Sequence, residues 1–457
     1  MAAPMEGRCS FFVAKKKRFC KMIVGKGKLY CGEHANMEEG GCSGRIVCPL
    51  DPNHTVTKDK LEKHLKRCNS RQRDSPVYYV ENRNGGSADE DEKLQQVSLS
   101  ERSRTELESL VVKLKTAVKG LELDVDVLSH PVLQDELNNP KNGDSALKHL
   151  KQQSSILGHL EQLGLLGGGR CFVEFGAGRG KLSHWIHEAL KTSEGPENKD
   201  LTMLLVERCS TRFKVDGKHQ DAGVQFERLQ VDIQHLDLSK VPVLQKKKLP
   251  LVGVGKHLCG AATDMALRCL LESPRHGEEN EPPQKRLKPP ESSKATDDPE
   301  PPESHPGPGP GPGPGPVLGI VVALCCHHRC EWRHYVGQRF FQQRGLGAAE
   351  FSAFCRMSSW ATCGLRPANQ DQTNHRRDEG GHEPAEETDA VNGFLTVSER
   401  EVVGRLCKLL INSGRRDFLE TKGFNSKLIQ YVDEDVTLEN VLLTSIPSSC
   451  SSCSSSD

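Results

Sequence analysis

The sequence lacks the features of a membrane or secreted protein. It contains no apolar run of about 18 residues, the length that a membrane-spanning helix needs, and it shows no signal peptide. We therefore expect no membrane partner and an intracellular location, in the cytoplasm, the nucleus or both. In such a chain the 18 cysteines are better interpreted as metal ligands and buried thiols than as disulfides.

The sequence also lacks net charge, because 62 Lys and Arg offset 62 Asp and Glu. The charge is unevenly distributed, however, since residues 1–73 contain 16 basic and only seven acidic side chains. Such an excess indicates a polyanionic partner, and beside metal-ligand spacings it favours nucleic acid. The length of 457 residues is enough for two or three domains.

Two sets of cysteines and histidines in this basic segment have the spacing of metal ligands. The first, Cys48-x5-His54-x9-His64-x3-Cys68, offers two thiolates and two imidazoles, which is a tetrahedral zinc set. A helix capped by Thr57 would place His64 and Cys68 on one face. Because so short a segment has little apolar core, zinc would supply much of its folding free energy. A CHHC zinc finger is therefore predicted at residues 45–72.

The second set, Cys9, Cys20, Cys31 and His34, offers three thiolates and one imidazole. The loops between these ligands contain basic residues with aromatic residues interleaved, as RNA contact through phosphates and base stacking requires. Cys42 is a competing ligand. We predict a CCCH finger at residues 1–40. Four protein ligands leave no open position, so both zinc ions are expected to be structural.

The segments between the motifs have a different composition. Residues 73–104 are predicted to be a linker, with a Gly/Ser/acid-rich tether at 82–92. Apolar residues at helical spacing predict a helical connector over 105–143, which either packs on a domain or forms a short coiled coil. Residues 273–316 and 366–392 are rich in Pro, Gly or polar residues and are expected to be disordered insertions.

A buried strand followed by three closely spaced glycines lies in the middle of the chain. The apolar run 170–175 leads into Gly176, Gly178 and Gly180, and a helix is predicted over 181–190. Glycine allows a ligand to approach the backbone, and a helix N-terminus favours phosphate-like or other polar groups. The dinucleotide fingerprint has its third glycine three positions after the second. The spacing here therefore favours S-adenosylmethionine over a nicotinamide cofactor, with a purely structural turn as the remaining alternative.

Three acidic residues are placed to bind parts of such a cofactor. Glu174 stands two positions before the first glycine, where enzymes that use S-adenosylmethionine often have an acidic residue that holds the methionine amino group. Glu207 ends the apolar run 201–206, a position suited to ribose hydroxyls. Asp232 is predicted to end a third apolar strand and to meet the adenine amino group.

The chain after residue 144 alternates predicted helices and strands. A helix is expected over 144–163, further strands at 251–255, 317–324, 427–432 and 439–444, and a long helix at 398–419. Residues 144–457 are therefore expected to form an α/β domain with the Rossmann-like, seven-strand sheet of an S-adenosylmethionine-dependent methyltransferase, preceded by two small zinc fingers. Ligands in such sheets bind at the carboxyl ends of the strands.

The residues after the fourth and fifth strands suggest the type of acceptor. The Asn/Asp-Pro-Pro-aromatic motif that is typical of amine methylation is absent. Lys256, His257 and His328 are present instead, with His327 and Arg329 nearby. Methylation of a sugar hydroxyl needs a base or a cation beside the developing alkoxide, so the first three are the candidate catalytic residues.

Other residues in these loops have a structural interpretation. Asp264 could orient the helix after the fourth strand, and Cys259 and Cys330 are more typical of buried thiols than of nucleophiles. Zinc at residues 325–330 is disfavoured, because adjacent ligands project to different sides of an extended chain. A base methyltransferase that uses Cys259 or Cys326 as a nucleophile is an alternative function.

Taken together, these motifs resemble the eukaryotic tRNA 2′-O-methyltransferases that modify the fourth nucleotide of the acceptor stem. The resemblance spans nearly the whole chain and comprises both fingers, Lys148-His149-Leu150-x-Gln152-Gln153, the loop 174–180, Lys256-His257-Leu258-Cys259-Gly260 and Cys325-Cys326-His327-His328. It implies S-adenosylmethionine as donor, the ribose 2′-hydroxyl of certain tRNAs as acceptor and the acceptor stem as partner. It gives no basis for inferring an obligate protein partner, and it identifies no secure catalytic base. A non-catalytic RNA-binding adaptor is the second alternative.

Overall fold

The computed structural model describes residues 6–13, 18–25, 27–31, 34, 45–66, 68, 75–86, 98–192, 200–209, 224–272, 315–363 and 395–448. The chain divides into two compact units, Met1–Pro76 and Val77–Asp457. The expected insertion 366–392, and 273–316 up to residue 314, lie outside the described residues, as does Cys42. No helix in the described ranges is long and apolar enough to cross a membrane.

The described residues of the first unit form two small hairpins and a short helix. Strands β1 (Phe12–Val13) and β2 (Arg18–Phe19) pair antiparallel, and so do β3 (Arg45–Cys48) and β4 (Asp51–Thr57). The helix predicted from Thr57 is shorter than expected: Thr57 makes no side-chain cap, a 3-10 turn comes first, and α2 covers only Leu61–Leu65. Cys68 therefore lies beyond the helix, whereas Cys48 ends β3.

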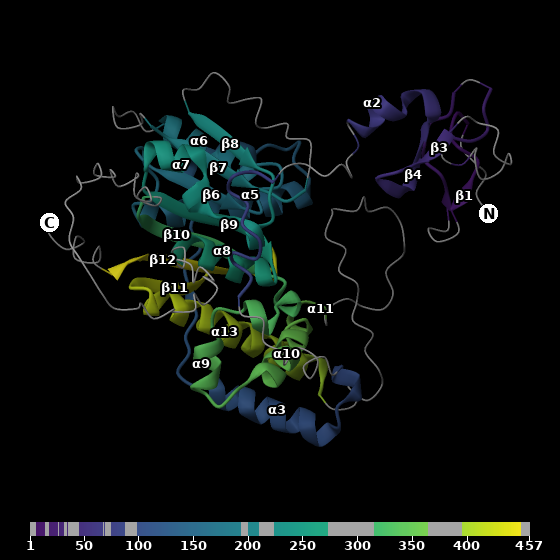
Figure 1. The fold of residues 1–457 in the computed structure, drawn as a ribbon. Coiled ribbons are helices and arrows are strands. Elements are labelled where there is room, and N and C mark those ends of the chain that lie inside the picture. Colours follow the sequence, from purple (N-terminus) through teal and green to yellow (C-terminus); the bar gives the residue numbers. More distant parts are fainter. Residues whose placement is uncertain are drawn as a thin grey trace, which may run out of the picture. The chain divides into compact units, whose positions relative to one another are not determined.

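The second unit is built around one sheet of eight strands in the order β5-β11-β12-β10-β9-β6-β7-β8 (Figure 1). The bounds of the strands are β5 Asp124–Val125, β6 Cys171–Phe175, β7 Thr202–Val206, β8 Gln225–Leu229, β9 Leu251–Cys259, β10 Val317–Cys325, β11 Phe424–Gln430 and β12 Val441–Pro447. The predicted count of seven is wrong because β5, a two-residue strand in the expected helical connector, adds to the edge. The third strand ends at Leu229, before Asp232 and not at it.

The five strands from β6 to β10 run parallel, and β12 pairs antiparallel with both β10 and β11. Parallel neighbours deliver their carboxyl ends to one edge of a sheet. The carboxyl ends of β6 to β10 and the loops after them, which together carry the candidate cofactor-binding and catalytic residues, therefore lie at one edge of the sheet.

Helices cover both faces of this sheet, because its central strands are apolar on both sides. On β6, Cys171, Val173 and Phe175 belong to one buried cluster and Phe172 to another. The first cluster includes residues of α7 (Pro242–Lys247) and α8 (Ala261–Leu271). The second includes residues of α5 (Asp144–Gln162) and α6 (Lys181–Thr192). The predicted helix at 144–163 is thus present, although Gly143 rather than Asp144 is its N-cap.

A third buried cluster joins the connector to the C-terminal half. Leu107, Leu110 and Leu114 of α3 (Arg104–Ala117) pack with apolar residues of the later helices. These helices are α9 Gln338–Gln342, α10 Ala348–Met357, α11 Trp360–Cys363 and α13 Val397–Thr421. The short α4 (Gln134–Leu137) lies outside this cluster. Since the apolar stripe of α3 is buried inside the unit, α3 is a packing helix, and the coiled-coil alternative is wrong.

Part of the expected linker is also folded onto the second unit. Tyr79 forms a β-bridge with Leu236. The Asn84 amide, only 1% exposed, donates to the carbonyls of Ile233 and Leu236 at 2.6 and 2.8 Å. The tether predicted at 82–92 is therefore wrong for residues 82–86, and residues 87–92 lie outside the described part.

Candidate cofactor pocket and zinc centres

The glycine loop after β6 has a backbone that only glycine adopts easily. Gly176, Gly178 and Gly180 have φ of 63°, 48° and 73°, all in the left-handed region. The Gly180 N–H donates to the Ala177 carbonyl at 2.7 Å, which closes a tight turn just before α6 begins. The sequence expectation that these positions require glycine agrees with this geometry.

Two charged side chains form hydrogen bonds to the backbone N–H and carbonyl of Gly178. The Gly178 N–H donates to Glu207 Oε2 at 2.9 Å, and its carbonyl accepts from Arg228 Nη1 at 3.0 Å. Glu207 follows β7 directly and also accepts from the Cys209 N–H at 3.0 Å. A Cβ built on Gly178 would meet no atom within 4 Å. The loop thus has open space on the outer side of Gly178, as a site that receives a ligand needs.

Glu174 is buried beneath this loop. Its Oε2 accepts from the Ser183 N–H at 3.0 Å and from the Ser183 hydroxyl. Burial raises the pKa of Glu174 to about 7, although the bonds from Ser183 oppose that rise. The bonds described for Glu174 tie β6 to the first turn of α6, and its expected contact with a methionine amino group stays a prediction.

Asp232 lies three residues after the end of β8 and caps a 3-10 turn, where its Oδ1 accepts from the Gln234 N–H at 3.0 Å. Its other oxygen is 3.6 Å from the guanidinium of Arg208, the residue after Glu207. The loops that follow β7 and β8 therefore lie side by side. The three predicted acids lie in or just after three adjacent strands, and their roles in cofactor binding stay predictions.

Lys256 lies within β9, which is longer than the sequence predicted. Its Nζ is 3.0 Å from His149 Nδ1 of α5. Burial, reinforced by the charge of Lys181, lowers the pKa of Lys256 to about 8, while the charge of Glu174 acts in the opposite direction. An amine with such a pKa is partly neutral near physiological pH and can accept a proton.

Of the two candidate histidines, His257 and His328, the structure describes the side chain of His328 only. The side chain of His257 lies outside the described part of the structure; its backbone is at a register shift between β9 and β10. His328 is exposed in the 3-10 turn His327–Arg329, which follows β10. His328 thus reaches solvent near the end of the strand that adjoins Lys256.

Neighbouring residues of the same motifs have structural partners. His327 is buried, and its Nε2 lies 2.7 Å from Asn412 Oδ1; burial lowers its pKa well below the usual value. Asp264 forms a buried ion pair with Arg415 at 2.7 Å, and Arg415 also donates to Cys330 Sγ at 3.1 Å. These contacts support the structural interpretation of Asp264 and Cys330.

Three thiols gather at the ends of β9 and β10. The sulfurs of Cys259 and Cys325 are 3.6 Å apart, and those of Cys259, Cys325 and Cys326 all lie within 4.8 Å of one another. Hydrogen bonds from Cys325 and Cys326 lower the pKa of Cys259 to about 3. The expectation that adjacent cysteines point apart is wrong here, because Cys326 has a left-handed backbone, with φ 52°.

The CHHC residues come together as the spacing predicted. The sulfurs of Cys48 and Cys68 are 3.8 Å apart, His54 and His64 Nε2 are 3.1 Å apart, and His64 Nε2 is 3.2 Å from Cys48 Sγ. Sulfurs in a tetrahedral zinc site are about 3.8 Å apart, given Zn–S bonds of about 2.3 Å. His54 Nδ1 lies 3.1 Å from Asp51 Oδ2, a carboxylate that would orient the ring. The cluster therefore fits a zinc ion.

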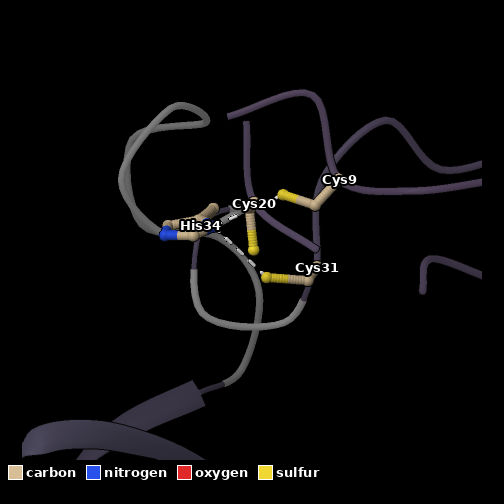
Figure 2. A group of neighbouring side chains, drawn as sticks. All are labelled: Cys9, Cys20, Cys31 and His34. Atoms are coloured by element: carbon tan, nitrogen blue, oxygen red, sulfur yellow. Dashed lines mark hydrogen bonds between the residues drawn. The ribbon is translucent and has the colours of Figure 1, made fainter. Parts of the chain in front are cut away.

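The CCCH residues form the second cluster, in which the four ligand atoms lie within 4.8 Å of one another. His34 Nδ1 is 3.3 Å from Cys9 Sγ and 3.4 Å from Cys31 Sγ, and Figure 2 shows Cys20 beside them. The His34 ring stacks on Phe11 with 4.0 Å between centroids, which fixes its direction. Three thiols and one imidazole at these separations also fit zinc.

The sequence did not point to one residue that contacts the glycine loop, nor to the proximity of three cysteines. Arg228, which holds the Gly178 carbonyl, lies in the middle of β8 and has no motif around it. Cys259, Cys325 and Cys326 could all be picked out in the sequence. That their sulfurs lie close together depends on the pairing of two strands, in which Cys259 and Cys325 are 66 residues apart in the chain.

Comparison with known families gives matches over most of the chain. A family model described as "Methyltransferase TRM13" matches residues 151–446, one described as "CCCH zinc finger in TRM13 protein" matches 7–35, and one described as "U11-48K-like CHHC zinc finger" matches 45–69. These ranges contain every candidate cofactor, catalytic and metal residue.

Whole-length relatives agree with the family matches. The chain is 51% identical to a human protein and 50% identical to a mouse protein, both named "tRNA:m(4)X modification enzyme TRM13 homolog"; each match covers 98% of this chain and 96% of the relative. It is 29% identical to the Saccharomyces cerevisiae "tRNA:m(4)X modification enzyme TRM13", over 95% of each chain.

Proposed function

This chain belongs to the TRM13 family of tRNA methyltransferases with CCCH and CHHC zinc fingers, and we propose that it methylates ribose. The proposed reaction transfers a methyl group from S-adenosylmethionine to the 2′-hydroxyl of the nucleotide at position 4 in the acceptor stem of certain tRNAs. The observation that carries the choice of a hydroxyl acceptor is Lys256, a partly buried amine in the carboxyl-terminal half of β9 whose pKa is lowered to about 8.

The donor is proposed to bind at the glycine loop of a Rossmann-like sheet. The open space at Gly178 and the nearby carboxylates of Glu207 and Asp232 support this placement, because a nucleoside presents ribose hydroxyls and an amino group that need acceptors. Glu207 and Asp232 would bind these groups, and Glu174 would hold the methionine amino group. S-adenosylmethionine supplies the electrophilic methyl group when it is bound.

Lys256 is the proposed general base. In its neutral form Nζ accepts the proton of the 2′-hydroxyl as the oxygen forms its bond to the methyl carbon in line with the breaking carbon–sulfur bond. His149 lies 3.0 Å from Nζ and would orient the amine. The exposed imidazole of His328 is proposed to contact the acceptor, and a role for His257 stays a prediction from the sequence.

The zinc fingers are proposed to bind the acceptor stem. The basic excess of residues 1–73 supports this, because phosphate contacts by Lys and Arg dominate the affinity of RNA-binding modules. Zinc would be structural in both fingers. An enzyme that acts on tRNA is expected in the cytoplasm or the nucleus.

The experiment that tests the proposal is transfer of a tritiated methyl group to a tRNA transcript by the full-length chain. Methylated ribose blocks cleavage of the following phosphodiester by alkali, since the 2′-oxygen can no longer attack. Label in one alkali-resistant dinucleotide that begins at position 4 is the expected result. Label in a free nucleotide with a modified base would contradict the ribose assignment.

A matched pair of lysine variants makes the test specific for the base. Lys256→Gln is expected to lower the rate of transfer by about 10²-fold or more while donor binding persists. Lys246→Gln, a change at an exposed lysine of α7, should leave the rate unchanged. Equal rates for both variants would remove Lys256 from the mechanism.

A further inference from the structure

The thiol group formed by Cys259, Cys325 and Cys326 belongs to the second unit, shares no residue with either finger and has no part in the proposed methyl transfer. Cys259 ends β9 and Cys325 ends β10, and the two residues are directly paired across these parallel strands. The position is therefore fixed by the centre of the sheet rather than by a surface loop. It offers three sulfur ligands at the edge where the candidate catalytic residues gather.

The backbone after both strands is bent so that the three sulfurs converge. Cys326 has φ 52° and ψ 45°, which turns its side chain back toward Cys325 instead of away from it. A left-handed conformation at a residue with a side chain costs about 1 kcal/mol or more and persists only where the surroundings require it. Gly260, which follows Cys259, has φ 60°, and a Cβ there would lie 2.4 Å from the Arg329 carbonyl oxygen. The loops after β9 and β10 are thus in tight contact beside the sulfurs.

The sulfur separations resemble those of a zinc site. Cys259 and Cys325 are 3.6 Å apart, close to the 3.8 Å between Cys48 and Cys68 of the CHHC finger. Thiolate sulfur is the ligand that zinc and other soft ions prefer. Cys325 and Cys326 are buried, whereas Cys259 is partly exposed, so an ion held here would be reached from the side of Cys259.

We propose that Cys259, Cys325 and Cys326 bind a third zinc ion. Three thiolates leave one tetrahedral position for solvent or another donor, unlike the fingers, whose four ligands close the site. The ion would join the carboxyl ends of β9 and β10 and hold the turn that carries His328. Nothing in the proposal depends on which atom of the tRNA is methylated.

The experiment is metal analysis of the full-length protein, purified under reducing conditions and freed of loosely bound ions by a weak chelator. The expected content is about three zinc ions per chain for the unchanged protein. Cys259→Ser and Cys326→Ser should each reduce it to about two, as should Cys48→Ser in the CHHC finger. Combining Cys259→Ser with Cys48→Ser should leave about one. Cys209→Ser, a change at an exposed cysteine outside the three clusters, should keep all three ions.

A second measurement covers the case in which the serine variants fail to fold. Native alkylation followed by peptide mass spectrometry of the unchanged protein should find all three thiols protected. They should react after a strong chelator removes zinc. About two zinc ions per chain with equal alkylation before and after chelation would overturn the proposal. So would a Cys259–Cys325 disulfide, recognised by the loss of two hydrogen masses. Neither result depends on methyltransferase activity, so the proposed reaction could still stand.

Discussion

Lys256 of β9 and His149 of α5 meet with 3.0 Å between Nζ and Nδ1, although they are 107 residues apart in the chain. Burial lowers the pKa of this lysine to about 8, from 10.5 in water. If neutral Lys256 is the base, the single-turnover rate should rise with pH and level off above about 8. Rapid-quench measurements across pH 6 to 10 would show it, and a flat profile would contradict the assignment.

The arginine variant separates the base from the positive charge at the same position. Lys256→Arg keeps the cation but cannot lose its proton in this range. The rate should fall by about 10²-fold or more, and the remaining activity should no longer change with pH near 8. If Lys256→Arg retains the full rate, the side chain acts as a fixed cation beside the oxygen instead.

Gly178 provides a test of the donor site. Its φ of 48° is strained for any side chain, although a Cβ there would meet no atom. Gly178→Val should therefore distort the loop, at a cost of about 1–3 kcal/mol, and weaken donor binding at least about tenfold in calorimetry. Gly143→Ala is the control, because Gly143 has φ −76° and equal free space. Unchanged donor affinity in Gly178→Val would place the donor elsewhere.

The buried pair of Asp264 and Arg415 should contribute strongly to stability. Their side chains are 1% and 0% exposed, and removal of one partner leaves a buried charge unpaired. Arg415→Met is expected to lower the free energy of unfolding by about 3–5 kcal/mol, measured by urea denaturation. Arg405→Met removes a guanidinium that is half exposed and should cost only about 0–1 kcal/mol. If the two variants lose similar amounts of unfolding free energy, the buried ion pair contributes no more to stability than the exposed one.

The CHHC finger should lose its fold together with its metal. His64→Ala removes one of four ligands, so one zinc ion should be lost and tRNA affinity should fall at least about tenfold with a shallower salt dependence. Glu62→Ala on the same helix changes a side chain that is 86% exposed and should retain both. Filter binding over a range of salt concentrations measures the effect. Loss of zinc without loss of affinity would exclude the finger from RNA binding.

The sequence predicted what depends on local spacing. The glycines at 176, 178 and 180 and the eight finger ligands were identified because turns and metal sites impose fixed residue types at fixed separations. The sheet was predicted less well. Strand β8 is an edge strand with Glu227 and Arg228 at its centre, so its apolar signal is weak and its end was misplaced. Strand β5 has only two residues and no periodicity at all.

Features set by tertiary packing were not predictable from neighbouring residues. Asn84 stands in a polar Gly-rich stretch, yet its amide is buried, where it donates to the carbonyls of Ile233 and Leu236. The left-handed turn at Cys326 has no local cause, since cysteine does not favour positive φ. It follows from the contact between the loops after β9 and β10.

Glu207 accepts a hydrogen bond from the Gly178 N–H, and Arg228 donates one to the Gly178 carbonyl. Arg228 belongs to β8, the strand at one edge of the sheet. Fraying of that strand would release the carbonyl and let the loop relax. If the donor binds at this loop as proposed, edge opening and donor release should be coupled: a bound donor should slow amide exchange along residues 225–229, even though none of those amides needs to touch it.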